Sequence, residues 1–252
     1  MLSENSILLR LPPGIDPKQM VFLDGIRHAA KIAGLAYFRL ESVLTWLVFN
    51  PKESAHQSKQ AYTAAFMDAW ALVDSVERFR MLWKMLPGFP FSSQEGKSKQ
   101  EHFEKITQPI RDLRNITDHL AQRADYVAAS GNPVLGLLTW VTYPDGAANH
   151  GYTCLLAPGT RMRSNWTLVN PAEGGYFSVP SRTGAIHLAA RDHRANLSAV
   201  IPEISSRIQE LERLIEGSLK QLGLEGKQAG GDHFAAIAFN AGSQAERESK
   251  PQ

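Results

Sequence analysis

Three long segments of this chain have helical patterning with almost no helix-breaking residue inside them. This feature constrains the possible folds of the chain most. The first segment starts where Asp16 precedes Pro17, a common helix start, and stops at Pro51. The second runs from about Glu53 to Leu86, and the third from about Gln100 to Ala129. Helices this long cannot bury an apolar stripe alone, so we expect an antiparallel bundle.

Apolar residues recur every three or four positions in each segment, which is the spacing of one helix face. They are Ile26, Ala30, Ala33, Tyr37, Leu40 and Leu44 in the first, Phe66, Trp70, Val73, Val76 and Leu82 in the second, and Ile106, Ile110, Leu113, Thr117, Leu120, Ala124 and Val127 in the third. Trp46, Trp70 and Trp83 lie among these residues, so we expect them in the core.

The pattern changes to short strands after "SGNP" (130–133). Strand candidates separated by Gly and Pro are "VLGLLTWVTY", "YTCLLAPG", "RSNWTLVNP", "GYFSVPS" and "GAIHLAAR". From about Asn196 to Gly223 the helical period returns, with Asp192 or Asn196 as the cap and Pro202 in the first turn. The expected fold is mainly α: a four-long-helix bundle with a small antiparallel β insertion at about 134–190, before the last helix. Residues 1–223 form one domain in this interpretation, and 224–252 form a loosely ordered tail.

The composition is that of an ordinary soluble domain. The 252 residues are 43% hydrophobic and 21% charged, with a net charge of +2, so any contact with nucleic acid must use a local basic patch. The single cysteine, Cys154, excludes an intramolecular disulfide within this sequence. The start has no long apolar stretch, and the run near Val43–Phe49 is too short to span a bilayer. We therefore expect a cytoplasmic protein without a membrane segment.

A polar run in the third helix, within "IRDLRNITDHLAQR" (110–123), has two interpretations. Asp112, Asn115, His119 and Gln122 share one helix face, with Arg111 and Arg123 at its edges. Arg114 lies about 140° around the axis from His119 and one turn before Asp118. The face is either solvated, with a weak Arg114–Asp118 pair, or it acts on a phosphodiester. In the second case His119 exchanges protons, Arg114 holds the phosphate, and Asn115 orients the imidazole or donates to a phosphate oxygen.

The run Arg114-Asn115-x-x-x-His119 resembles the Rx4-6H motif of HEPN-domain proteins. That resemblance implies an all-helical, dimeric fold and a metal-independent ribonuclease or an RNA-binding protein. By position it makes Arg114, Asn115 and His119 the catalytic set. We expect Asp112, Arg111 and Arg123 to contact the substrate, and we expect no cofactor and no metal. Because one histidine is half of an acid–base pair, we expect a homodimer packed through the third helix that supplies the second.

Other candidate sites have simpler structural interpretations. His187, Asp192 and His193 could ligate a metal, but nothing nearby in the sequence completes the ligand set. The β insertion concentrates aromatic residues and arginines that would either bind RNA or pack the sheet on the bundle: Trp140, Tyr143, Trp166, Tyr176, Phe177, Arg161, Arg163 and Arg182. The alternative to an RNA-acting protein is a non-catalytic helical dimer that binds a protein or small ligand through this insertion.

Overall fold

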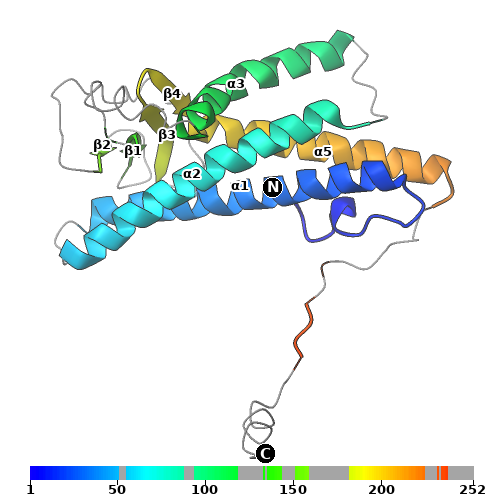
Figure 1. The fold of residues 1–252 in the computed structure, drawn as a ribbon, viewed down its shortest axis with the longest axis horizontal. Helices are drawn as coiled ribbons and strands as arrows, with labels where there is room; N and C mark the ends of the chain where they lie inside the picture. The colour runs from blue at the N-terminus through cyan, green and yellow to red at the C-terminus, as the bar shows by residue number, and fades with distance from the viewer. Residues whose placement is uncertain are drawn as a thin grey trace, which may run out of the picture.

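The computed structural model of the protein describes residues 1–50, 55–87, 94–118, 133, 135–143, 151–158, 182–224, 232 and 234–237. Within these residues it holds four long helices and a four-stranded antiparallel sheet that precedes the last helix. The sheet lies at one end of the helices, as Figure 1 shows. The fold class expected from the sequence is confirmed.

The first two helices, α1 (Pro17–Phe49) and α2 (Ala55–Met85), lie side by side along most of their length (Figure 1). α1 begins as predicted, because the Asp16 carboxylate accepts a hydrogen bond from the Gln19 amide at 3.0 Å. Its small buried residues let neighbouring helices approach closely: Ala29, Ala30, Ala33 and Ala36. A short 3-10 turn, η1 (Ile7–Leu9), packs Leu8 into the same core.

α1 is also long and apolar enough to cross a membrane, judged by length and composition alone. The apolar run near Val43–Phe49, which alone is too short to span a bilayer, is only the last part of this helix. One flank of α1 is buried against the other helices, whereas Ile32, Leu35 and Phe38 are 48%, 58% and 65% exposed. In this fold α1 is therefore a core helix with an apolar outer face.

The third helix, α3, spans Gln94–Asp118. It begins before the start predicted at about Gln100, because "QEGKSK" (94–99) is also helical. Gly96 costs a helix about 1 kcal/mol, but the Gln, Glu and Lys around it are good helix formers. The buried side of α3 carries Phe103, Thr107, Ile110, Leu113 and Ile116. The predicted continuation from residue 119 to Ala129 lies outside the described residues.

The sheet has the order β2-β1-β3-β4, with β1 (Leu137–Thr142), β2 (Tyr152–Leu156), β3 (Thr183–Ala190) and β4 (His193–Asn196). All of β1 is buried, and its Trp140 packs with the helical core. β4 extends the sheet beyond residue 190 and was not predicted, because "HRAN" has no β-branched or aromatic residue. The predicted strands at 163–171 and 175–181 lie outside the described residues.

The last helix, α5 (Leu197–Gln221), closes the bundle. Of the two predicted caps, Asn196 is the one used: its side chain accepts a hydrogen bond from the Ala199 amide at 3.1 Å. Pro202 lies in the second turn, not the first, so it withholds the hydrogen bond that residue 202 would give the Ser198 carbonyl. The Ser198 hydroxyl also joins three elements, accepting from the Ile186 amide at 2.9 Å and contacting the Tyr37 hydroxyl at 3.0 Å.

A buried arginine fastens α5 to α2 and α3. The guanidinium of Arg207 lies 5.3 Å from the centre of the Trp83 ring and 4.4 Å from that of Phe103. It also donates to the Lys99 carbonyl. Burial lowers the pKa of Arg207, and three glutamates, Glu210, Glu203 and Glu104, offset part of that effect. Trp83 is fully buried, as predicted.

Candidate functional site

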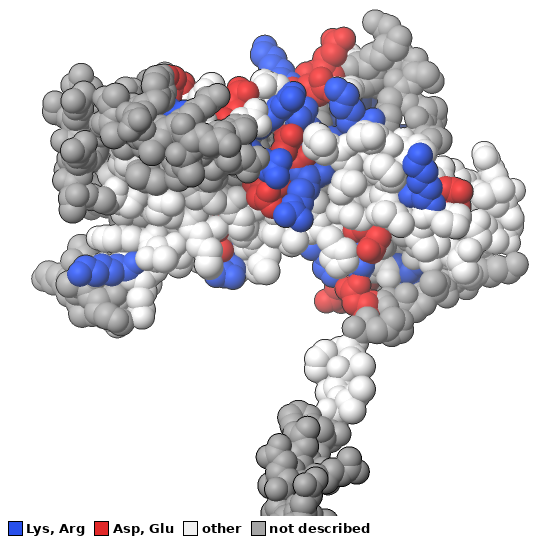
Figure 2. Space-filling model, in the orientation of Figure 1, with Lys and Arg blue, Asp and Glu red and all other residues white. Residues whose placement is uncertain are grey.

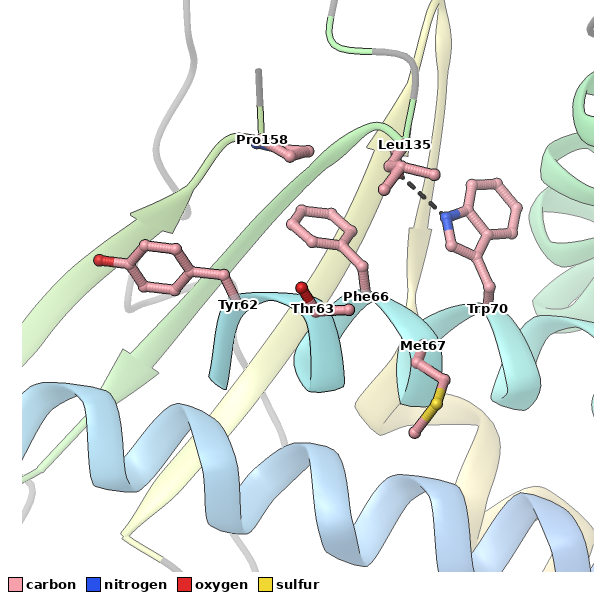
Figure 3. A pocket seen from close by; sticks show the side chains of 7 residues that line it. All are labelled: Tyr62, Thr63, Phe66, Met67, Trp70, Leu135 and Pro158. Carbon is pink, nitrogen blue, oxygen red and sulfur yellow. Dashed lines mark hydrogen bonds between the residues drawn. The ribbon is translucent and has the colours of Figure 1, made fainter. Parts of the chain in front are cut away.

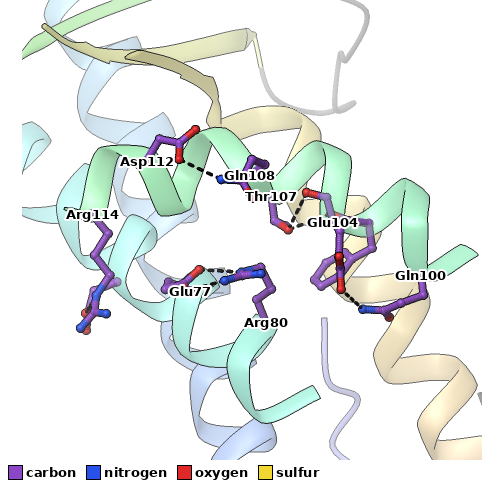
Figure 4. Close-up of polar contacts among 10 residues, drawn as sticks. Glu77, Arg80, Gln100, Glu104, Thr107, Gln108, Asp112 and Arg114 are labelled. Carbon is purple, nitrogen blue, oxygen red and sulfur yellow. Dashed lines mark hydrogen bonds and ion pairs between the residues drawn. The ribbon is translucent and has the colours of Figure 1, made fainter. Parts of the chain in front are cut away.

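The polar residues singled out on the third helix separate onto different flanks of α3. Arg111 and Asn115 are exposed, while Asp112 and Arg114 are partly buried. Arg114 points toward α2, whereas Asp112 points toward the sheet, as Figure 4 shows. His119 and Arg123 lie outside the described residues. The proposed catalytic roles of Arg114, Asn115 and His119 therefore stay predictions.

Arg114 takes part in an ion-pair cluster between α2 and α3. Its Nε donates to Asp74 Oδ1 at 3.1 Å, and Arg78 Nε donates to the other oxygen, Asp74 Oδ2, at 2.8 Å. The side chains of Arg78, Asp74 and Arg114 are 66%, 40% and 38% exposed. Two guanidinium groups share one carboxylate, and all three side chains are partly open to solvent. We call Arg78, Asp74 and Arg114 the arginine cluster.

Asp112 belongs to a separate polar group on the opposite flank. Its Oδ1 accepts a hydrogen bond from Gln108 Nε2 at 2.8 Å, and its Oδ2 lies 4.0 Å from His193 Nδ1 of β4. Residues 112 and 114 project about 160° apart around a helix axis, because each residue turns the chain by about 100°. Asp112 and Arg114 of one chain therefore do not meet on a common ligand.

Beneath the α2–α3 contact lies a buried ion pair within α2. Arg80 and Glu77 make two parallel hydrogen bonds of 2.7 and 2.9 Å, and both side chains are less than a tenth exposed (Figure 4). The hydrogen bonds to Glu77 raise the pKa of Arg80, against the opposing effect of burial, and Glu104 and Asp112 of α3 raise it further. The pair is neutral overall, and its Arg80 guanidinium is near enough to Glu104 and Asp112 of α3 to feel their charge.

Charged side chains gather in one band of the surface seen in Figure 2, where lysines and arginines alternate with acids. The described exposed residues of α3 are all polar: Ser98, Lys99, Glu101, His102, Lys105, Gln108, Arg111 and Asn115. A partner on α3 would therefore be recognised through charge and hydrogen bonds. The exposed apolar residues noted above lie instead on α1.

An apolar pocket of about 310 Å³ opens along α2, and its lining residue Trp70 lies one helical turn before Asp74 of the arginine cluster. Its walls come from α2 and from the ends of the sheet, as Figure 3 shows: Tyr62, Thr63, Phe66, Met67, Trp70, Leu135 and Pro158. Trp70 Nε1 donates to the Leu135 carbonyl at 3.0 Å, which fixes the plane of the indole. Trp70 was expected in the core, but it is only partly buried and lines this pocket. Its spacing along α2 could not distinguish the two positions, because the pocket depends on residues far away in the sequence.

The two histidines considered as metal ligands, His187 and His193, contact different groups. His187 Nδ1 is 2.9 Å from the Ala185 carbonyl, and His193 faces Asp112. The described residues contain no group of three or more His, Cys, Asp or Glu placed to hold a metal ion. Burial raises the pKa of the Cys154 thiol to about 11, so this side chain is a poor nucleophile at neutral pH.

The aromatic residues of the β insertion that the structure describes have packing roles. Trp140 is buried, and Arg182 lies 5.7 Å from the centre of the Phe49 ring on α1. Tyr143 is partly buried and packs against Val141 and Ala185. The remaining members of the expected basic aromatic surface lie outside the described residues: Trp166, Tyr176, Phe177, Arg161 and Arg163.

Comparisons with known proteins return no matching family model, no matching curated protein and no matching solved structure.

Proposed function

We propose that this protein is a HEPN-like homodimer that binds RNA and cleaves it without a metal ion. The proposal rests on the motif Arg114-Asn115-x-x-x-His119 and on one observation above all. Arg114 is partly exposed, and Asp74 of the neighbouring helix holds its Nε. Asp74 thereby orients a partly exposed guanidinium, a group that can offset the charge developing on a phosphodiester.

The reaction we infer uses the neighbouring hydroxyl of RNA as its nucleophile. His119, acting as the base, takes the proton of the 2′-OH, and O2′ bonds to phosphorus while the bond to O5′ breaks. The departing O5′ receives a proton from a second acid, and the products are a 2′,3′-cyclic phosphate and a 5′-hydroxyl. Arg114 offsets the charge on the non-bridging oxygens, and Asn115, exposed on the same helix, orients the imidazole or donates to the phosphate.

The second acid would come from the other protomer. On the helix that the sequence predicts to continue through position 119, Arg114 would lie about 140° around the axis from His119, so one chain would not easily direct both side chains at one phosphate. A two-fold pairing of α3 brings Arg114 of one chain near His119 of the other. The polar exposed surface of α3 supports an interface made by hydrogen bonds and ion pairs. Arg111, Asp112 and Arg123 would then contact substrate at its edges.

The experiment is an RNA cleavage assay in excess EDTA. Single-stranded and structured RNAs are incubated with the wild type and with His119→Ala and Arg114→Gln, and thermal unfolding is measured for each. The proposal expects cleavage by the wild type, a loss of at least about a hundredfold in His119→Ala, and unchanged unfolding temperatures. Equal cleavage by the wild type and His119→Ala would remove the proposed role of His119. An absence of cleavage by the wild type would remove the ribonuclease.

A second function class is favoured by α1. Its exposed Ile32, Leu35 and Phe38 form an apolar face of the kind that binds another protein. A non-catalytic helical dimer would use such a face, with or without the β insertion, and would bind no RNA even at low salt. The substitution Leu35→Glu separates the classes. If the protein is the ribonuclease, this variant cleaves RNA at the wild-type rate. If it is the non-catalytic dimer, the variant loses its α1 interface and neither protein cleaves RNA.

A further inference from the structure

We infer that the apolar pocket next to the arginine cluster along α2 binds an unpaired nucleobase, so that the substrate is single-stranded RNA with one base packed in the aromatic wall that Trp70, Tyr62 and Phe66 form. This inference rests on the proposed function and names the substrate class of the same site. It assigns a role to residues of α2 that the motif on α3 does not contain.

The position of the pocket is the first argument. Trp70 precedes Asp74 by four residues on α2, so the indole and the carboxylate stand one turn apart, about 6 Å along the axis. Asp74 holds both Arg78 and Arg114. A nucleotide has a flat apolar base and a charged phosphate separated by one sugar. Along α2 the apolar wall of the pocket is followed, one turn after Trp70, by the carboxylate that holds the two guanidinium groups.

The chemistry of the walls is the second argument. Three of the seven lining residues are aromatic, and the pocket's surface is almost entirely apolar. The only indole N–H in the wall is already bonded to the Leu135 carbonyl, so Trp70 presents its ring to an occupant and not a donor (Figure 3). Stacking on such a wall accepts any base, since every base has a π face. We therefore expect binding that depends on the presence of a base and little on its identity.

The size of the pocket is the third argument. A volume of about 310 Å³ lies at the lower end of the range of small-ligand sites, which holds one base and excludes a base pair. Tyr62 and Met67 are 41% and 52% exposed at its rim, so an occupant would also cover apolar surface that faces water. A base in a duplex cannot enter without leaving its stack, which makes unpaired RNA the preferred ligand.

The test measures the dissociation constant of RNA, in EDTA and at low salt, for the wild type, Tyr62→Leu, Trp70→Leu and a control, Phe38→Leu. Phe38 is an exposed aromatic residue of α1 outside the pocket. Decamers of uridine, of adenosine and of abasic ribose phosphate are the probes, at a temperature where cleavage is slow. We expect both pocket variants to bind the base-bearing decamers roughly five- to tenfold more weakly, Phe38→Leu to bind normally, and the abasic decamer to bind weakly to every protein.

The outcomes separate this inference from the proposed function. Equal binding of abasic and base-bearing RNA, or normal binding by both pocket variants, would overturn the base pocket even if His119-dependent cleavage occurs. Base-dependent binding that the pocket variants lose would support the pocket even if the wild type cleaves nothing. No binding of any decamer at low salt would overturn both. Trp70→Leu also removes the hydrogen bond to Leu135. If that variant folds poorly, the binding measured for Tyr62→Leu decides the test, because the Tyr62 side chain lies at the rim.

Discussion

At the scale of single residues, the arginine cluster shows how a motif on one helix depends on another helix. Asp74 orients Arg114 but makes an exposed ion pair, and such pairs contribute only about 0–1 kcal/mol to stability. We therefore expect Asp74→Asn to lower RNA cleavage about tenfold, while the free energy of unfolding changes by less than about 1 kcal/mol. Cleavage assays and urea denaturation check this. Glu101→Gln, an exposed change on α3, serves as the control, and an unchanged rate in Asp74→Asn would mean that Asp74 does not position Arg114.

Asp68 provides a prediction for pH. Its side chain is 5% exposed, and its Oδ2 lies 3.3 Å from Arg39 Nε without forming an aligned hydrogen bond. Burial raises the pKa of Asp68, and the charge of Arg39 offsets part of this. Burial outweighs the ion pair, because the half-exposed Arg39 is screened by solvent.

A raised pKa in the folded state means that the ionised carboxylate destabilises the fold. The protonated Asp68 therefore contributes stability that is fully present below the ordinary pKa of aspartate and is lost as the pH rises through the raised pKa. Asp68→Asn should therefore gain stability relative to the wild type as the pH increases across this window and then level off. Urea denaturation at a series of pH values from about 3 to about 7 measures the difference. A difference that shrinks as the pH rises would contradict the argument.

At the scale of elements, the last helix depends on the side chain that caps its start. Asn196 ends β4 and caps α5, so one side chain fixes the junction between sheet and helix. We expect Asn196→Ala to lower the free energy of unfolding by about 1 kcal/mol, and Asn196→Asp to restore most of it, because a carboxylate also caps. Chemical denaturation checks both variants. Equal stability of all three proteins would show that the cap contributes nothing here.

The sequence predicted elements best where local chemistry determines them. Asp16 with Pro17, and Asn196 with the stripe after it, mark the starts of α1 and α5 because capping is a short-range interaction. β4 escaped prediction because its strand conformation comes from pairing with β3, not from its own residues. Pro202 was placed in the wrong turn because a helix in a packed core tolerates one missing hydrogen bond that an isolated helix would not.

The site was harder to predict, because its contacts join distant segments. The (i, i+4) rule offered Asp118 as the partner of Arg114, and the side chain of Asp118 lies outside the described residues; the described partner is Asp74, forty residues away on α2. Nothing in the spacing of α2 distinguishes Asp74 from any other surface acid. The pocket residue Trp70 has the same helical spacing as its buried neighbours and was for that reason assigned to the core.

At the scale of the whole molecule, mixing variants tests whether one site is shared by two chains. A chain with both Arg114→Gln and His119→Ala contributes neither group, so in its dimer with the wild type every site that needs groups from both chains is incomplete. We expect an equimolar mixture of the wild type and this double variant, unfolded and refolded together, to keep about a quarter of wild-type activity, because only the quarter of dimers with two wild-type chains hold intact sites. Retention of about half of the activity would place the site within one chain.

The most direct test of the central claim is the chemistry of the RNA ends. Mass spectrometry of fragments made by the wild type in excess EDTA identifies the group on each side of the cut. If His119 and Arg114 drive attack by the 2′-hydroxyl, the upstream fragment ends in a 2′,3′-cyclic phosphate and the downstream fragment begins with a 5′-hydroxyl, and a 2′-O-methyl group at the cleavage position prevents cutting. Fragments with a 5′-phosphate, or cutting that persists at the methylated position, would contradict this account.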